Sequence, residues 1–137
     1  MGCGKMSLTL PNQTALYCRT AGFCEFAIQR QKWTLRAYAK EHNLKNPVFY
    51  VDNGFHGRGF DHRPDFCKMN DNILNGLVKR VVAISLSRIG RDLLDTTEWL
   101  WSISELGIDF IDLQNPEGIY PHEVMTDTIL AIAQRQS

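Results

Sequence analysis

Apolar residues gather in four short runs, separated by longer segments with helical spacing. The short runs are rich in β-branched and aromatic residues and end near turn-forming residues, which is typical of buried strands. They cover residues 14–18, 47–52, 78–86 and 108–113. Strands that alternate with helices along a chain predict a parallel, doubly wound sheet. The expected fold is a single α/β domain with a parallel four-stranded core sheet flanked by helices.

The helical segments carry boundary signals of their own. Pro64 suits the first turn of a helix that Gly76 ends, because proline is pre-organised for that position and glycine favours helix ends. The run from Asp95 to Glu98 supplies capping residues for a later helix that stops at Gly107. Four helices are therefore expected, over residues 26–42, 64–75, 95–106 and 121–134.

Length and composition narrow the class of protein. A chain of 137 residues with 44% apolar and 22% charged residues is sized for one globular domain. Residues 1–13 lack periodicity and are expected to be a flexible tail, with the domain spanning 14–137. No run resembles a signal peptide or the roughly 20 apolar residues of a membrane span, so we expect a cytoplasmic protein without a membrane partner.

The cysteines and the overall charge favour neither a metal site nor a strongly charged partner. The four cysteines form no Cys-x-x-Cys pair, so free thiols and no metal are expected. Fifteen basic side chains balance fifteen acidic ones, which gives a formal net charge of zero. Any contact with nucleic acid must therefore come from a local concentration of positive charge.

Arginines follow three of the four expected strands. Arg19 comes after the first strand, Arg63 lies in the loop after the second, and Arg88 and Arg91 follow the third. Ligands of doubly wound sheets bind beyond the carboxyl ends of the strands. If residues 88–91 are helical, the two arginines there share a face and can grip one anion. The pattern indicates a phosphate site, although solvated surface charges explain the spacing equally well.

Five short motifs occur in a fixed order between Tyr17 and Asp92. They are Tyr17-Cys18-Arg19, Ile28-Gln29, the segment from Tyr50 to Gly57, Arg63-Pro64-Asp65-Phe66, and the segment from Ser87 to Asp92. In this order and spacing they resemble the catalytic domain of the serine site-specific recombinases, the resolvase/invertase family. The likeness extends to the chain end, where residues 128–134 are similar to the start of that family's interface helix.

The resemblance implies DNA strand exchange without a metal or other cofactor. In the family a serine attacks the phosphodiester and forms a covalent 5′-phosphoserine link, and the subunits of a synaptic tetramer then exchange partners. Pre-organised arginines suit this chemistry because they stabilise the negative charge that develops on the phosphoryl oxygens. The partners implied are DNA and further copies of the chain, in a homodimer or tetramer. The catalytic residues implied are Arg19, Gln29, Arg63, Arg88 and Arg91.

The sequence departs from the family pattern at the nucleophile. The pattern is Tyr-x-Arg-Val-Ser, and here Arg19 is followed by Thr20 and Ala21, which has no nucleophilic atom. Thr20 and Ser87 are the possible substitutes. His56 replaces a hydroxyl residue in the loop after the second strand, where it is expected to contact the phosphate. The acidic residue expected just before the paired arginines is also missing.

These observations support three functions of different classes. The first is a recombinase domain for site-specific DNA strand exchange that is degenerate at the nucleophile. The second is a non-catalytic DNA-binding or dimerisation module that regulates a recombinase, and the third is a binder of small-molecule phosphates. Because the charge is balanced and no downstream DNA-binding region follows, the DNA affinity of this domain alone is expected to be weak and salt-sensitive.

Overall fold

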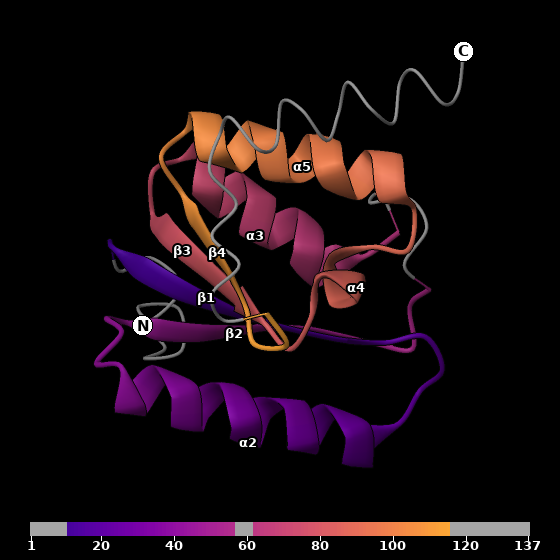
Figure 1. Ribbon diagram of the computed structural model, residues 1–137. Helices are drawn as coiled ribbons and strands as arrows, with labels where there is room; N and C mark the ends of the chain where they lie inside the picture. The colour runs from indigo at the N-terminus through magenta and orange to yellow at the C-terminus, as the bar shows by residue number, and fades with distance from the viewer. Residues whose placement is uncertain (1–10, 57–61, 116–137) are drawn as a thin grey trace, which may run out of the picture.

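The computed structural model describes residues 11–56 and 62–115, which form a sheet of four parallel strands with helices on both faces (Figure 1). The strand order is β2-β1-β3-β4, so β1 and β3 are the central strands. This sheet confirms the expected α/β fold. The strands are β1 (Gln13–Thr20), β2 (Pro47–Asn53), β3 (Val78–Ala83) and β4 (Asp109–Asp112).

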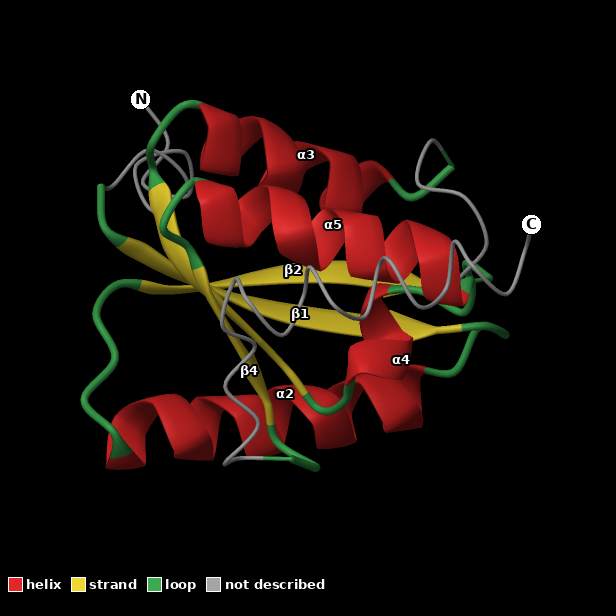
Figure 2. Ribbon diagram, turned by 45° about the horizontal axis from the view of Figure 1, so that its top comes forward, coloured by secondary structure: helices red, strands yellow, loops and turns green. Residues whose placement is uncertain are grey.

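The helices divide between the two faces of the sheet. Helix α2 (Glu25–Glu41) covers one face, and α3 (Pro64–Leu74) and α5 (Leu93–Glu105) lie side by side on the other (Figures 1 and 2). The short helix α4 (Leu86–Ile89) follows directly after β3. Within the described ranges, no helix has both the length and the apolar character needed to cross a membrane.

The central strand β1 supplies side chains to two separate cores. Successive residues of a strand point to opposite faces. Ala15 and Tyr17 accordingly belong to the core beneath α3 and α5, whereas Leu16 and Cys18 belong to the core beneath α2. All eight residues of β1 are buried, which explains why this segment lacks the alternation of polar and apolar residues seen in half-exposed strands.

The chain after β3 differs from its sequence-based prediction. The prediction of a single strand over 78–86 was wrong. In the structure β3 ends at Ala83, and the chain then turns into α4. The Asp112 carboxylate accepts a hydrogen bond from the Leu86 N–H at 3.1 Å, so a residue distant in sequence fixes this turn. Helix α5 begins earlier than predicted, because Asp92 is its N-cap and accepts from the Asp95 N–H.

The other predicted helices agree with the structure where it describes them. Helices α2 and α3 each lie within one residue of the predicted bounds at both ends. The helix predicted to end at residue 106 ends at Glu105, and Leu106, which follows it, is 53% exposed. The helix predicted over 121–134 and most of the predicted tail lie outside the described residues, and β1 begins at Gln13.

Candidate functional site

Three of the predicted arginines meet at the carboxyl edge of the sheet. Arg19 is the penultimate residue of β1, Arg63 is the N-cap of α3, and Arg88 lies in α4 directly after β3. Arg19 is 3% exposed and Arg63 is 1% exposed, whereas Arg88 is half-buried. Parallel strands end at the same edge of a sheet, which is why residues so far apart in sequence come together here. We call these three residues the arginine cluster.

Arg19 is hydrogen-bonded inside the protein. Its Nε donates to the Arg88 carbonyl at 2.9 Å, and its two Nη atoms donate to the Phe55 and Ser87 carbonyls at 2.9 and 2.8 Å. Burial lowers the pKa of Arg19 below its ordinary value, and the nearby charge of Arg63 lowers it further. Arg19 therefore fastens the turn after β2 and the start of α4 to the end of β1.

Arg63 lies in a buried polar network. Its Nε and one Nη donate to the Tyr17 hydroxyl at 3.1 and 2.8 Å, and Tyr17 in turn donates to the Asp52 carboxylate at 2.6 Å. The same Nη of Arg63 is 3.2 Å from the Arg88 carbonyl. The guanidinium carbon lies 4.1 Å from the centroid of the Phe66 ring, in cation–π contact. A charge this deeply buried needs such partners, and its removal is costly.

Asp52, like Tyr17, belongs to this network but was not among the site residues predicted from the sequence. It is 1% exposed and, besides Tyr17, accepts hydrogen bonds from the Asp65 and Phe66 N–H groups, both at 3.0 Å. These N–H groups belong to the first turn of α3, where a negative charge is favourable. Burial raises the pKa of Tyr17 well above its ordinary value, so this hydroxyl remains a donor to Asp52. The sequence signal that could have identified Asp52 is an acidic residue near the end of a buried strand.

Arg88 and Arg91 are placed differently from each other. The Arg88 side chain donates from Nη1 to the Arg19 carbonyl at 3.1 Å, and its buried Nε has no partner among the described residues. Arg91 is exposed. The pKa of Arg19 is lowered mainly by burial and then by Arg63 and Arg88, and the charge of Arg91 has the smallest effect. Helix α4 ends at Ile89, and Gly90 is extended with a φ of −173°. The segment 88–91 is therefore not helical throughout, so the condition for a shared helical face is not met.

The glutamine that contacts the arginine cluster is Gln31. Its buried side chain accepts from the Arg19 N–H at 3.1 Å and donates to the Arg19 carbonyl at 3.0 Å. The predicted Gln29 is exposed and donates instead to Glu25, one helical turn earlier on α2. The structure thus brings Gln31 to the site and leaves Gln29 at the surface of α2.

The position expected for a nucleophile lies in the open loop between β1 and α2. We call residues 21–24 the open loop, since all four of them are exposed. Ala21 is its first residue. The two possible substitutes both have hydroxyls engaged elsewhere. Thr20 Oγ1 donates to Asn53 Oδ1 at 2.7 Å, and the hydroxyl of Ser87 is 2.6 Å from that of Ser85.

The remaining candidate residues lie at the margin of the cluster. His56 is exposed and follows Phe55, whose carbonyl accepts from Arg19. The described cysteines carry free thiols, as expected. Cys18 is fully buried, and burial raises the pKa of its thiol to about 12, so it is not a thiolate at neutral pH. Cys24 lies in the open loop, where its N–H donates to Asn53 Oδ1.

Comparison with known proteins gives a family and a fold. No curated protein matches the chain. A crystal structure of the N-terminal catalytic domain of TP901-1 integrase is similar, with a TM-score of 0.77 and 23% identity over 91% of this chain and 96% of the other. A resolvase family site-specific recombinase from Streptococcus pneumoniae gives a TM-score of 0.75 and 23% identity, over 91% of this chain and 87% of the other.

The family assignment comes from the sequence itself. The family described as "Resolvase, N terminal domain" matches residues 14–137, which is most of the chain. The sheet order and the buried arginines at its carboxyl edge are the structural counterpart of the motifs that suggested this family. The chain therefore belongs to the resolvase family, through that family's N-terminal domain, and its role lies in site-specific DNA recombination.

Proposed function

We propose that this domain binds the phosphate backbone of DNA without cleaving it, and so acts as a non-catalytic module in recombination. Ala21 carries the proposal. It stands directly after the last residues of β1, beside a complete arginine cluster, and has no atom that could attack phosphorus. Phosphate binding and phosphodiester cleavage are separable, because the first needs positive charge and hydrogen-bond donors whereas the second also needs an activated nucleophile.

Neither neighbouring hydroxyl is placed to replace the missing serine. Thr20 is 6% exposed, and its Oγ1 both donates to Asn53 and accepts from the Gly54 N–H at 3.1 Å. Attack by Thr20 would require both contacts to break, and an amide oxygen such as that of Asn53 is too weak a base to activate a hydroxyl. Ser87 is exposed and paired with Ser85, whose hydroxyl is an equally weak base.

The arginines divide into two roles in this proposal. Arg19 and Arg63 use their donors on Phe55, Ser87 and Tyr17, among other groups of the protein, so they position the edge of the sheet. Arg88 and Arg91 contact the phosphate, because Arg88 retains unused donors and Arg91 is exposed. Gln31 positions Arg19 through its backbone.

The partners proposed are DNA and other copies of the chain. Domains of the resolvase family act on DNA and oligomerise. We propose a homodimer or tetramer here, with DNA affinity that is weak for this domain alone because the net charge is zero and few phosphates are contacted.

The test combines a binding assay with an assay for covalent attachment. The wild-type chain is mixed with supercoiled plasmid and with labelled duplex DNA at low salt. We expect weak binding that falls steeply as salt rises, and no protein attached to a DNA end after denaturation. Arg88→Gln should weaken the binding, whereas Thr20→Val should leave it intact.

Two results would overturn the proposal. Covalent attachment mapped to Thr20 or Ser87 of the wild-type chain would show an active enzyme with a substitute nucleophile. Absence of any DNA binding at low salt would remove the phosphate contact. The variant Ala21→Ser, which restores the family's hydroxyl in the open loop, is the gain-of-function counterpart, and covalent attachment by this variant alone would support the proposal most directly.

A further inference from the structure

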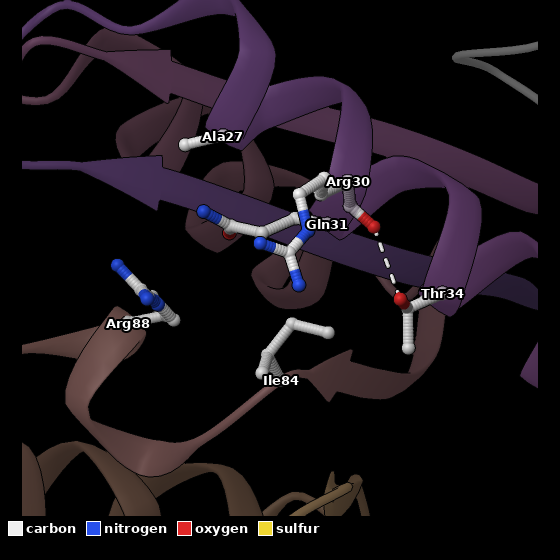
Figure 3. A pocket seen from close by; sticks show the side chains of 6 residues that line it. All are labelled: Ala27, Arg30, Gln31, Thr34, Ile84 and Arg88. Carbon is white, nitrogen blue, oxygen red and sulfur yellow. Dashed lines mark hydrogen bonds between the residues drawn. The ribbon is translucent and has the colours of Figure 1, made fainter.

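A pocket that shares Arg88 with the arginine cluster lies between α2 and the segment that runs from β3 into α4 (Figure 3). Its volume is about 240 Å³. One water molecule occupies about 30 Å³ in the liquid, so this space holds several waters or one phosphate group with its neighbouring atoms. The lining residues come from both sides of the pocket and are Ala27, Arg30, Gln31, Thr34, Ile84 and Arg88.

The wall formed by α2 is continuous. Ala27 is followed three and four positions later by Arg30 and Gln31, and these are followed four and three positions later by Thr34, so the four residues lie along one side of the helix. Thr34 Oγ1 donates to the Arg30 carbonyl at 3.0 Å, which leaves the Arg30 guanidinium out of this contact. That guanidinium lies 6.0 Å from the centroid of the exposed Phe26 ring, and Figure 3 shows it extending from α2 into the pocket.

The opposite wall brings a second guanidinium. Arg88 reaches the pocket from α4, and Figure 3 shows it on the side across from α2. Its Nη1 is committed to the Arg19 carbonyl, but its Nε is buried and has no partner in the described part of the chain. An acceptor in the pocket can instead be bound by the terminal Nη groups of Arg88, of which only Nη1 has a protein partner.

The charge around this pocket is of one sign. Two of its six lining residues are arginines and none is acidic, and no contact between a carboxylate and Arg30 or Arg88 occurs within residues 11–56 and 62–115. Arg30 is exposed, so water weakens its repulsion with Arg88, and an anion between the two guanidiniums is attracted by both. Phosphate is the matching anion, because its oxygens accept paired hydrogen bonds from the planar fork of arginine.

The pocket also adjoins the arginine cluster. Gln31 lines the pocket and holds the backbone of Arg19, and Arg88 belongs to both places. We propose that the pocket is a second phosphate subsite, in which Arg30 and Arg88 bind a backbone phosphate next to the one at the cluster. This inference rests on the proposed function, because that function supplies the DNA whose phosphate is bound. The same two arginines would bind a free phosphate ion in the same way.

The experiment compares two arginines of the same helix. Binding of a short labelled DNA duplex to the full chain is measured at several salt concentrations for wild type, Arg30→Gln and Arg36→Gln. Arg36 is exposed and lies 5.2 Å from the centroid of the Phe49 ring, away from the pocket, so it is the matched control. We expect Arg30→Gln to weaken binding about tenfold and to reduce the salt slope by roughly 1, and Arg36→Gln to change neither.

The outcomes separate this inference from the proposed function. If Arg30→Gln binds DNA as wild type does while Arg88→Gln does not, the second subsite is refuted and the proposed function stands. If the wild type fails to bind DNA, the proposed function fails, and inorganic phosphate becomes the probe. A phosphate-dependent NMR shift of the Arg30 side-chain N–H, absent in Arg30→Gln, then supports a site for free phosphate, and no shift refutes the subsite.

Discussion

Two regions that meet at the end of β1 differ in how deeply their side chains are buried and in how they are hydrogen-bonded. On one side is the arginine cluster, in which Arg19 and Arg63 are almost fully buried and donate to backbone carbonyls and to Tyr17. On the other side, two residues beyond Arg19, the open loop begins at Ala21 with all of its residues exposed. The cluster is part of the fold, whereas the side chains of the loop are not.

Because of this difference, the residues on which the stability of the domain depends are not the residues of the loop where a nucleophile is expected. A substitution of Arg19 or Arg63 leaves buried polar groups without their partner, which is among the most destabilising kinds of change. A substitution at Ala21 changes an exposed side chain, and such changes alter stability by less than about 0.5 kcal/mol. The fold therefore does not depend on the side chain at position 21, and under the proposed function an alanine there leaves the arginine cluster intact.

The largest effect is expected from Arg63→Ala. It removes a buried guanidinium and leaves the Tyr17 hydroxyl, which donates to Asp52, without its own two donors. We expect the free energy of unfolding to fall by about 3 kcal/mol or more, measured by urea denaturation. Ala21→Ser is the matched change in the open loop and should alter it by less than about 0.5 kcal/mol. Similar losses for the two variants would contradict the division between cluster and loop.

A smaller effect is expected where the two regions touch. Gly54 has a φ of +90°, and a Cβ there would lie 3.3 Å from the Cβ and N atoms of Phe23 in the open loop. Gly54→Ala should therefore cost about 1–2 kcal/mol through backbone strain and crowding. Gly22→Ala is the control, because a Cβ at Gly22 meets nothing within 4 Å. Thermal unfolding of both variants measures the difference, and a Gly54→Ala variant as stable as wild type would show that Phe23 yields freely.

The smallest effect concerns pH and the residue before Arg19. The pKa of the Cys18 thiol is raised to about 12 by burial, from an ordinary value of 9.0. Above pH 9 the unfolded chain therefore loses this proton first, and stability falls as pH rises toward 12. We expect the wild type to lose about 1 kcal/mol more than Cys18→Ala between pH 8 and 10, from urea midpoints. Cys24→Ala, in the open loop, should follow the wild type, and parallel curves for all three would refute the effect of burial.

Periodicity and topology predicted most of the fold but only the location of the site. The four strands and the helices around them follow from local patterns, and the meeting of Arg19, Arg63 and Arg88 follows from parallel strands that end at one edge. The contacts within the site depend on tertiary structure. Helix α4 forms where Asp112 caps the turn after β3, which no local pattern could show.

The rotation of α2 about its axis, which decides the glutamine that faces the sheet, is the other feature that the sequence did not predict. Both Gln29 and Gln31 lie on α2, and the loop after β1 decides which of the two faces the strand. The structure selects Gln31, because its side chain pairs with both backbone groups of Arg19. A shift of two residues along a helix turns a side chain by more than half a turn, from the sheet to the solvent.

The three hydrogen bonds of the Arg19 guanidinium have a consequence for local opening. They tie β1 to two carbonyls at the start of α4 and to one in the turn after β2, segments that are otherwise short and partly exposed. None of these segments can detach without breaking a bond to the same side chain. We therefore expect the edge of the sheet to open as one cooperative unit, so that its amide protons exchange with solvent with similar protection factors.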